Sequence, residues 1–233
     1  EETMAILEIT NLSYDYITKA GRVHAVKDAT ASFDTGIVYA IVGRSGSGKS
    51  TLMSLMAGLD VPKAGKILYE GTDLASIDRD RYRREHVGMI FQSYYLLPQL
   101  TAVENVELAL ELSKYEGDRR ERAMEMLSLV GIAKEQFRKR SPEFSGGEQQ
   151  RIAVARAIAA DPSVILADEP TGNLDNENSL NIVGILGDLA HRFGKCVIII
   201  THASEVAERA DMTLHMNDGY LSVSESGTRE AGG

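Results

Sequence analysis

The chain has 233 residues, of which 43% are hydrophobic and 25% charged, a composition typical of a globular protein with one sizeable core. Its 25 basic and 34 acidic residues give a net charge of -9, which argues against nucleic acid as a partner, because such proteins need a clustered basic surface. No apolar run approaches the roughly 20 residues that cross a bilayer, no signal-peptide pattern opens the chain, and the single cysteine, Cys196, excludes an internal disulfide, so we expect a cytosolic protein.

Apolar runs bounded by turn residues indicate strands that alternate with helices. The predicted strands cover residues 5–10, 28–33, 37–42, 66–69, 86–91, 163–167, 197–201 and 212–216. Helices are expected at 49–57 and, with clear helical periodicity, between 101 and 160. Strands that alternate with helices favour a parallel or mixed sheet covered on both faces.

No repeat and no linker divides the chain, so residues 4–223 are expected to form one domain. Within it, residues 4–92 and 161–223 would build the part that contains the sheet. The mostly helical block 93–160 would be an insertion into that core. The small and polar stretch 224–233 is expected to be a mobile tail.

A glycine-rich loop links the strand at 37–42 to the helix at 49–57. Its sequence "GRSGSGKS" satisfies G-x-x-x-x-G-K-[ST] in the strand–loop–helix context that a phosphate-binding loop requires. The Lys49 side chain should reach the β- and γ-phosphates of a nucleotide, and the Ser50 hydroxyl should bind Mg²⁺. The nucleotide-binding residues predicted here are Gly43, Arg44, Ser45, Gly46, Ser47, Gly48, Lys49, Ser50 and Thr51.

Two adjacent carboxylates follow the apolar strand at 163–167. Asp168 and Glu169 would repel each other there without a cation, so Asp168 is expected to bind Mg²⁺ through water. Glu169 would then polarise the attacking water as general base. The alternative is an exposed acidic turn, which is ordinary in so acidic a chain.

Two further strands end in polar side chains. His202 follows the strand at 197–201, where a neutral imidazole could hydrogen-bond a γ-phosphate and help hold the attacking water. Gln92 follows the strand at 86–91, and its amide oxygen could complete the Mg²⁺ shell. Each residue type is also common at the end of a strand. Because ligands of α/β sheets bind beyond the carboxyl ends of the strands, we expect these groups to meet the phosphate loop at one edge.

A further polar feature is the segment "EFSGGEQQR", residues 143–151, at the start of a helix. Ser145 and Glu148 have the spacing of a capping box, which would satisfy the free N–H groups of that helix. Capping explains the serine and the glutamate, but it gives the glycines Gly146 and Gly147 no role within the chain.

With these residues in place, the chain resembles the nucleotide-binding domain of ABC transporters over residues 5–223. In that family "GRSGSGKS" is the Walker A loop, "VILADE" the Walker B strand, "FSGGE" the signature motif and "GNLD" the D-loop. Gln92 matches the Q-loop residue and His202 the switch histidine. The resemblance implies a P-loop NTPase α/β core, an N-terminal antiparallel β subdomain and an inserted helical subdomain that carries the signature.

The resemblance also implies that two copies dimerise head to tail around two ATP molecules with Mg²⁺. Ser145 and Gly147 would then contact the ATP held by the other copy, with Asp175 of the D-loop nearby. Tyr16 falls where the family stacks an aromatic ring on adenine, and Tyr14 is the alternative.

Two positions depart from the family pattern. Phe144 replaces the usual leucine, and Glu148 stands where many members have glutamine. A carboxylate near a triphosphate is unfavourable unless it points back to the helix N–H groups.

A closer resemblance is to the lipoprotein-release, macrolide-export and antimicrobial-peptide transporters. It implies a permease subunit that docks near Tyr94, Tyr95, Leu96, Leu97 and Pro98, and therefore a peripheral location on the inner face of the membrane. These residues could instead pack into the helical subdomain. An ABC ATPase of a non-transport regulatory or assembly complex remains open, whereas a kinase or small GTPase would leave residues 143–151 unexplained.

Overall fold

The computed structural model describes residues 5–19 and 21–223, and the predicted tail at 224–233 lies outside the described residues. The strands are β1 Leu7–Thr18, β2 Gly21–Phe33, β3 Val38–Val42, β4 Ala64–Tyr69, β5 Thr72–Asp73, β6 Val87–Phe91, β7 Val164–Asp168, β8 Cys196–Thr201, β9 Met212–Asn217 and β10 Tyr220–Val223. The helices are α1 Lys49–Met56, α2 Arg79–Glu85, α3 Ala102–Leu112, α4 Arg119–Leu129, α5 Gly146–Ile158, α6 Asn176–His191 and α7 Ser204–Ala207. Three short 3-10 turns cover Leu74–Ser76, Lys134–Gln136 and Ser141–Glu143.

All of the predicted strands are present, but β1 and β2 are about twice as long as expected. They form an antiparallel hairpin whose pairing continues to Thr18 and Gly21. The residues toward the turn are mostly exposed and polar, so they carry no apolar run that would have extended the prediction.

The larger sheet has six strands in the order β10-β9-β3-β8-β7-β6. From β9 to β6 every neighbouring pair is parallel, and only β10 runs antiparallel to its neighbour. This is the predicted mixed, mainly parallel sheet. Because β3, β8, β7 and β6 are consecutive neighbours, their carboxyl ends lie side by side at one edge.

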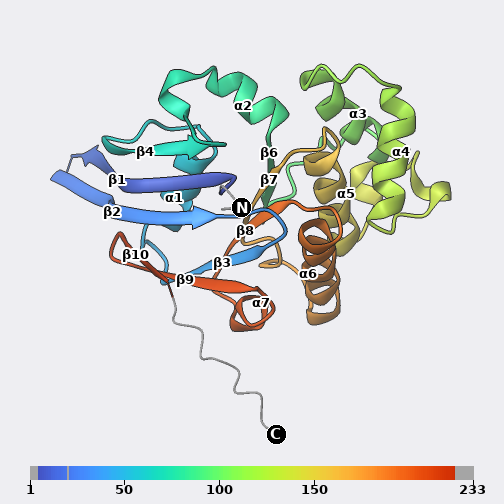
Figure 1. The fold of residues 1–233 in the computed structure, drawn as a ribbon. Coiled ribbons are helices and arrows are strands. Elements are labelled where there is room, and N and C mark those ends of the chain that lie inside the picture. Colours follow the sequence, from blue (N-terminus) through green and yellow to red (C-terminus); the bar gives the residue numbers. More distant parts are fainter. Residues whose placement is uncertain (1–4, 20, 224–233) are drawn as a thin grey trace, which may run out of the picture.

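A second, antiparallel sheet of four strands has the order β2-β1-β4-β5. It corresponds to the N-terminal β subdomain that the family resemblance implies. In Figure 1, β1, β2 and β4 lie on one side of the molecule, and α3, α4 and α5 lie on the other.

Both faces of the larger sheet are buried, each in its own apolar cluster. On β8, Val197 and Ile199 belong to the cluster that contains the residues of α3 to α6, whereas Ile198 and Ile200 face α1 and the second sheet. This alternation explains the uninterrupted apolar run of β8, because successive side chains of a strand point to opposite faces.

The helices α3, α4 and α5 pack against one another through fully buried residues such as Val106, Leu127 and Ile152. In the part of the chain that the structure describes, no helix combines the length and the apolar character needed to cross a membrane.

Candidate functional site

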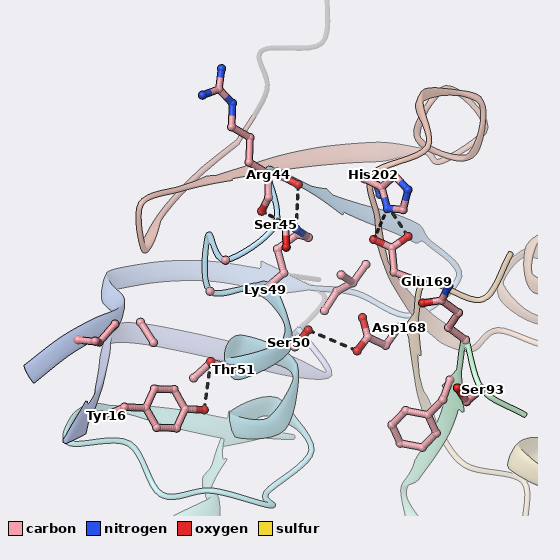
Figure 2. Close-up of a pocket in the computed structure, with 18 of the residues that line it drawn as sticks. Tyr16, Arg44, Ser45, Lys49, Ser50, Thr51, Ser93, Asp168, Glu169 and His202 are labelled. Atoms are coloured by element: carbon pink, nitrogen blue, oxygen red, sulfur yellow. Dashed lines mark hydrogen bonds and ion pairs between the residues drawn. The ribbon is translucent and has the colours of Figure 1, made fainter. Parts of the chain in front are cut away.

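The carboxyl ends of β3, β8, β7 and β6 meet at an open pocket of about 850 Å³ (Figure 2). The strand register pairs Val42 with Thr201, and Asp168 with both Ile200 and Phe91, so the residues that follow each strand emerge at the same edge. Of the predicted site residues, those that line the pocket are Tyr16, Gly43, Arg44, Ser45, Gly46, Gly48, Lys49, Ser50, Thr51, Gln92, Asp168, Glu169 and His202.

The glycines of the loop after β3 are required by its conformation and its packing. Gly46 and Gly48 have φ values of 77° and 105°, in the left-handed region that other residues rarely adopt. A Cβ atom on Gly48 would collide with the carbonyl of Ala25 on β2, and one on Gly43 would collide with the carbonyl of Met216 on β9. The loop therefore keeps this shape only with glycine at these positions.

The N-terminus of α1 opens toward the pocket. Gly48 is its N-cap and supplies no side-chain cap, and no acidic residue occupies the first turn. Free N–H groups and the positive end of the helix dipole are therefore available to an anion, which fits a nucleotide phosphate.

Lys49 and Ser47 are the buried side chains of this loop. The Lys49 ammonium donates hydrogen bonds to the carbonyls of Gly43 at 2.8 Å and Arg44 at 3.0 Å. Ser47 is also buried and does not line the pocket, and its carbonyl accepts the N–H of Gly219. Among the predicted loop residues, Ser47 therefore packs inside the protein and does not face the pocket.

Asp168 ends β7 opposite the first turn of α1. Its Oδ2 atom accepts the Ser50 hydroxyl at 3.4 Å. Burial and the neighbouring Glu169 raise the pKa of Asp168, and the contacts with Ser50 and Lys49 only partly oppose this shift. A carboxylate whose charge is disfavoured in this way gains from a nearby cation, so the oxygen donors of Ser50 and Asp168 fit a hard divalent ion.

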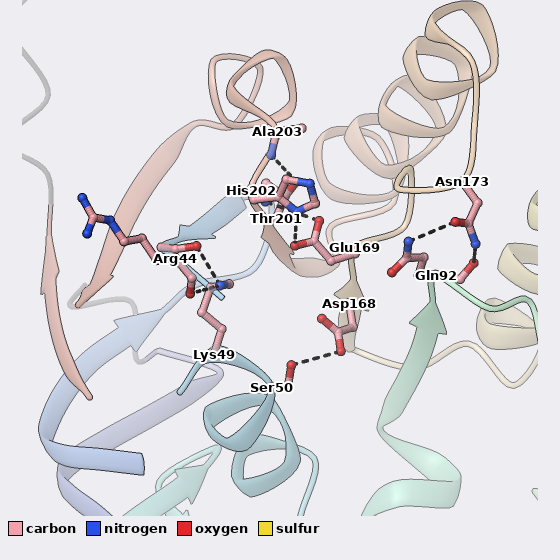
Figure 3. Close-up of polar contacts among 11 residues, drawn as sticks. Arg44, Lys49, Ser50, Gln92, Asp168, Glu169, Asn173, Thr201, His202 and Ala203 are labelled. Atoms are coloured by element: carbon pink, nitrogen blue, oxygen red, sulfur yellow. Dashed lines mark hydrogen bonds and ion pairs between the residues drawn. The ribbon is translucent and has the colours of Figure 1, made fainter. Parts of the chain in front are cut away.

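Glu169 and His202 form a pair at adjacent strand ends (Figure 3). Glu169 has a φ of 47°, and its carboxylate accepts hydrogen bonds from His202 Nδ1 at 2.7 Å and from the His202 backbone N–H at 3.3 Å. The Glu169 side chain is mostly buried, whereas the His202 ring is 71% exposed. The carboxylate is therefore held in one orientation beside the pocket.

Gln92 is oriented by Asn173, a residue of the loop between β7 and α6. Gln92 Nε2 donates to Asn173 Oδ1 at 3.0 Å, and Asn173 Nδ2 donates to the Gln92 carbonyl at 3.2 Å. Figure 3 shows the remaining amide oxygen of Gln92 turned toward Asp168 and away from Asn173. The amide thus presents its oxygen to the side of the pocket where Asp168 lies.

Of the two N-terminal tyrosines, Tyr16 lines the pocket. Its ring is 41% exposed, and its hydroxyl lies 3.2 Å from the Thr51 hydroxyl. Tyr14 packs edge-on against Tyr16, with ring centroids 5.1 Å apart, and hydrogen-bonds Asp60 instead. Of these two tyrosines, Tyr16 is therefore the one that offers the pocket a ring on which a flat ligand can stack.

Ser145 and Glu148 form the predicted capping box at the start of α5. The Ser145 N–H donates to Glu148 Oε2 at 2.9 Å, and the Glu148 N–H donates to Ser145 Oγ at 3.3 Å. The Ser145 N–H, with Gln136 and the Ser145 hydroxyl, lowers the pKa of Glu148 against the opposing effect of burial. The carboxylate of Glu148 therefore points back to the helix terminus. This is the orientation in which a glutamate at this position is not unfavourable near a triphosphate.

Ser145, Gly147 and Asp175 do not line the pocket of their own chain. The side chain of Asp175 instead caps α6 by accepting the Asn178 N–H at 2.8 Å. The prediction that ties these residues to nucleotide concerns the pocket of a second copy.

Both signature glycines also have a packing role within the chain, which the capping box does not explain. A Cβ atom on Gly147 would collide with the side chain of Asn178 on α6, and one on Gly146 would lie 2.9 Å from the Tyr94 hydroxyl. Both glycines allow α5 to start close to α6 and to the segment after β6. Contacts between distant segments decide this, so no local pattern predicts it.

In the segment after β6, some residues are fixed by hydrogen bonds or packing, and others are exposed. Arg156 of α5 donates to the carbonyls of Tyr95 at 2.5 Å and Tyr94 at 2.9 Å. Leu96 packs against the helical core, whereas Tyr95 is 67% and Leu97 37% exposed. The packing alternative therefore holds for Leu96 but not for Tyr95 and Leu97.

Tyr95 and Leu97 border an open groove of about 400 Å³ between the sheet and the helical block. Its apolar lining includes Met89, Leu97, Leu108, Leu112 and Pro162, and its basic lining consists of Arg83, Arg84 and Arg156.

Three residues that shape the site were not among the predicted ones: Asn173, Arg156 and Gln150. Gln150 of α5 is buried and donates to the carbonyls of Pro170 at 2.7 Å and Phe91 at 3.2 Å, so it ties α5 to the ends of β6 and β7. Gly147, Gln150 and Val154 share the buried face of α5. A polar residue on the apolar stripe of a helix is the signal that could have found Gln150.

The sequence model of the family described as ABC transporter matches residues 26–172. The ABC transporter ATP-binding protein YclH of Bacillus subtilis is 41% identical, and the match covers 96% of this chain and 98% of YclH. The macrolide export ATP-binding/permease protein MacB of Bradyrhizobium diazoefficiens is 42% identical over 98% of this chain, but this chain spans only 35% of that protein.

Two solved structures have the same fold. The ATP-binding cassette MJ0796, as a dimer in a post-hydrolysis state bound to ADP and Pi, aligns with a TM-score of 0.84 at 34% identity, over 93% of this chain and 96% of that one. The protein cbiO1 of Clostridium perfringens, part of the transporter complex cbiONQ, aligns with a TM-score of 0.81 at 28% identity, over 94% of this chain and 87% of that one.

Proposed function

The chain belongs to the ABC transporter family and is an ATP-binding, ATP-hydrolysing subunit, and we propose that two copies clasp two ATP molecules head to tail and drive a permease. One observation carries the proposal of a shared site. The pocket holds the phosphate loop and the residues at four strand ends, but the signature residues Ser145 and Gly147 lie outside it. A second copy would bring the N-terminus of its α5, a further anion-binding helix end, to the open side of the pocket.

In this proposal, each pocket residue acts on a defined part of the nucleotide. Tyr16 stacks on the adenine, the N–H groups of the loop after β3 surround the phosphates, and Lys49 leaves its two carbonyls to bind the β- and γ-phosphates. Ser145 and Gly147 of the second copy contact the γ-phosphate, and Asp175 lies next to them.

The oxygen donors of Ser50, Asp168 and Gln92 would hold Mg²⁺, with Asp168 acting through water. Magnesium bound with ATP supplies positive charge that offsets the charge developing on the phosphate oxygens.

Glu169 is proposed as the general base. Its carboxylate accepts the proton of the attacking water as the water oxygen bonds to the γ-phosphorus and the bond to the β–γ bridging oxygen breaks. His202 holds that carboxylate through Nδ1–H. A neutral imidazole carries a single N–H, so with ATP bound the exposed ring of His202 would turn that N–H from Glu169 to the γ-phosphate.

The groove beside Tyr95 and Leu97 is proposed as the docking site of the permease. Exposed apolar side chains around a groove are typical of an interface, and Arg156 links this segment to the signature helix α5. Closure of the dimer would then move the docked permease. The permease places the subunit on the inner face of the membrane, and the proposed substrate is an exported or released peptide, lipoprotein or drug-like molecule. The name of MacB, which refers to macrolide export, supports the drug-like class.

The predicted division of the domain is retained in this proposal. Residues 4–92 and 161–223 would form the nucleotide-binding core with the β subdomain, and 93–160 the helical subdomain. The mutual packing of α3, α4 and α5 supports that the helical part moves as one unit.

A complementation experiment tests the shared site. Lys49→Ala removes the phosphate-loop lysine from both sites of a homodimer, and Ser145→Arg blocks both signature motifs, so each variant alone should be inactive. When the two are mixed, about half of the dimers are heterodimers with one intact site, and about a quarter of the wild-type ATPase rate should return. ATPase activity that stays absent in the mixture, with both variants folded and dimerising, would contradict the shared site.

A further inference from the structure

Asn173 and Gln92 hold each other by reciprocal hydrogen bonds. Asn173 accepts the Gln92 side-chain Nε2 at 3.0 Å and donates to the Gln92 backbone carbonyl at 3.2 Å. One side chain thereby binds both the main chain and the side chain of its partner. This pairing fixes the orientation of the Gln92 amide, with Nε2 on the side of Asn173. The reason is that a carbonyl oxygen can only accept a hydrogen bond and an amide nitrogen can only donate one.

The neighbouring residues restrict the position of the Gln92 amide. A Cβ atom on Gly172 would lie 2.7 Å from Gln92 Nε2, so glycine at this position makes room for the amide beside Asn173. Gln150 bonds both Phe91 and Pro170, and thus holds the backbone on either side of the pair. The loop after β6 and the loop after β7 are in this way tied together at the pocket edge.

We propose that Asn173 is a positioning residue that keeps the Gln92 amide oxygen toward the cation site, an inference that rests on the proposed role of Gln92 as a magnesium ligand. An amide can turn either its oxygen or its NH₂ group to the pocket, and only the oxygen can bind a hard cation. With Nε2 committed to Asn173, the oxygen faces Asp168, as Figure 3 shows. Asn173 itself does not line the pocket.

The expected size of the effect follows from other metal sites. Groups that orient a metal ligand typically change metal affinity by about 10- to 100-fold when they are removed. Without Asn173 the amide can rotate and present NH₂ to the cation, so we expect the affinity for the divalent ion to fall by about tenfold. The affinity for ATP without metal should be unchanged, because Asn173 does not line the nucleotide pocket.

The experiment measures Mn²⁺ binding by electron paramagnetic resonance in the presence of ATP. Glu169→Gln is used as the background, so that ATP is not consumed. In this background Gln92→Ala, Asn173→Ala and the double variant are compared, with Asn181→Ala on the exposed face of α6 as the matched control. We expect each single substitution to weaken Mn²⁺ binding, the double variant to bind no more weakly than Gln92→Ala, and the control to bind normally.

Several outcomes would overturn the inference. If Gln92→Ala weakens Mn²⁺ binding but Asn173→Ala does not, Asn173 has no positioning role, and the proposed role of Gln92 stands. If the two effects add, or if Asn173→Ala also weakens ATP binding in the presence of EDTA, Asn173 acts independently of the amide. If Gln92→Ala leaves Mn²⁺ binding unchanged, the proposed metal role of Gln92 fails, and the inference fails with it.

Discussion

Glu169 Oε1 lies 2.7 Å from His202 Nδ1, and the backbone N–H of His202 donates to the other carboxylate oxygen at 3.3 Å. The two residues follow adjacent parallel strands, β7 and β8, so the sheet itself brings them together. A carboxylate held by two donors from one residue keeps a fixed orientation beside the phosphate loop, as a general base requires.

Glu169→Gln is expected to lower the ATPase turnover rate by at least about 100-fold, because the amide cannot accept the proton of the attacking water. ATP binding should persist, so size-exclusion chromatography with ATP and Mg²⁺ should show an accumulated dimer. Glu125→Gln, an exposed carboxylate on α4, is the matched control and should hydrolyse ATP normally. A Glu169→Gln protein that stays monomeric with ATP and turns over at the wild-type rate would refute the role of Glu169.

Lys49→Ala is expected to weaken ATP binding by about 100-fold or more, because it removes a charged hydrogen-bond donor from the phosphates. Equilibrium binding of a fluorescent ATP analogue measures the change. Lys66→Ala, which removes an exposed lysine from β4, should bind as the wild type does. Equal affinities of the two variants would count against the phosphate-loop assignment.

Asp168→Asn is expected to raise the melting temperature of the nucleotide-free protein at neutral pH. Burial and Glu169 raise the folded-state pKa of Asp168, so its ionisation favours the unfolded chain. The stability linked to this group is fully present below the unfolded pKa, near 4, and is lost as the pH rises through the folded pKa. The advantage of the variant should therefore disappear as the pH is lowered toward 4.

Thermal unfolding across this pH range, without nucleotide, measures the difference. The same variant should lose the extra stabilisation that Mg²⁺ with ATP gives the wild type. A constant difference between the two proteins at all pH values would show that the charge of Asp168 is not the cause.

Gly147→Ala is expected to lower the free energy of unfolding by about 1–3 kcal/mol, because the added methyl group collides with Asn178. The loss should appear in a single chain, without nucleotide or partner. Asn178→Ala in the same protein makes room for the methyl group and should restore part of the stability. Urea unfolding of the two single variants and the double variant gives the coupling, and strictly additive effects would contradict the proposed contact.

Leu97→Ser combined with Leu112→Ser is expected to abolish capture of the permease from detergent-solubilised membranes. The two side chains are 37% and 63% exposed at the groove, so their replacement should leave basal ATP hydrolysis and the melting temperature unchanged. Phe193→Ser, at a site after α6 whose exposure of 46% lies between those of Leu97 and Leu112, is the control and should still capture the permease. If the wild-type chain captures no membrane protein at all, the non-transport alternative is favoured.

Local patterns predicted the residues at the strand ends because these residues belong to short motifs of adjacent positions. The glycine-rich loop, Asp168 with Glu169, and the capping box of Ser145 and Glu148 each occupy a few adjacent positions. The structure places the loop and the two carboxylates at one pocket and forms the capping box. The lengths of β1 and β2 were underestimated, because the pairing of their exposed halves leaves no apolar run in the sequence.

The sequence by itself determined that Gly43 to Ser50 form a glycine-rich loop between a strand and a helix, because loop conformation depends on glycines at fixed local spacing. Only the tertiary structure decided that Asn173 orients Gln92, that Gly147 makes room for Asn178, and that Glu169 meets His202. These pairs join segments that are distant in the chain. Strand order and helix packing, which depend on the burial of the whole core, determine which of those segments become neighbours.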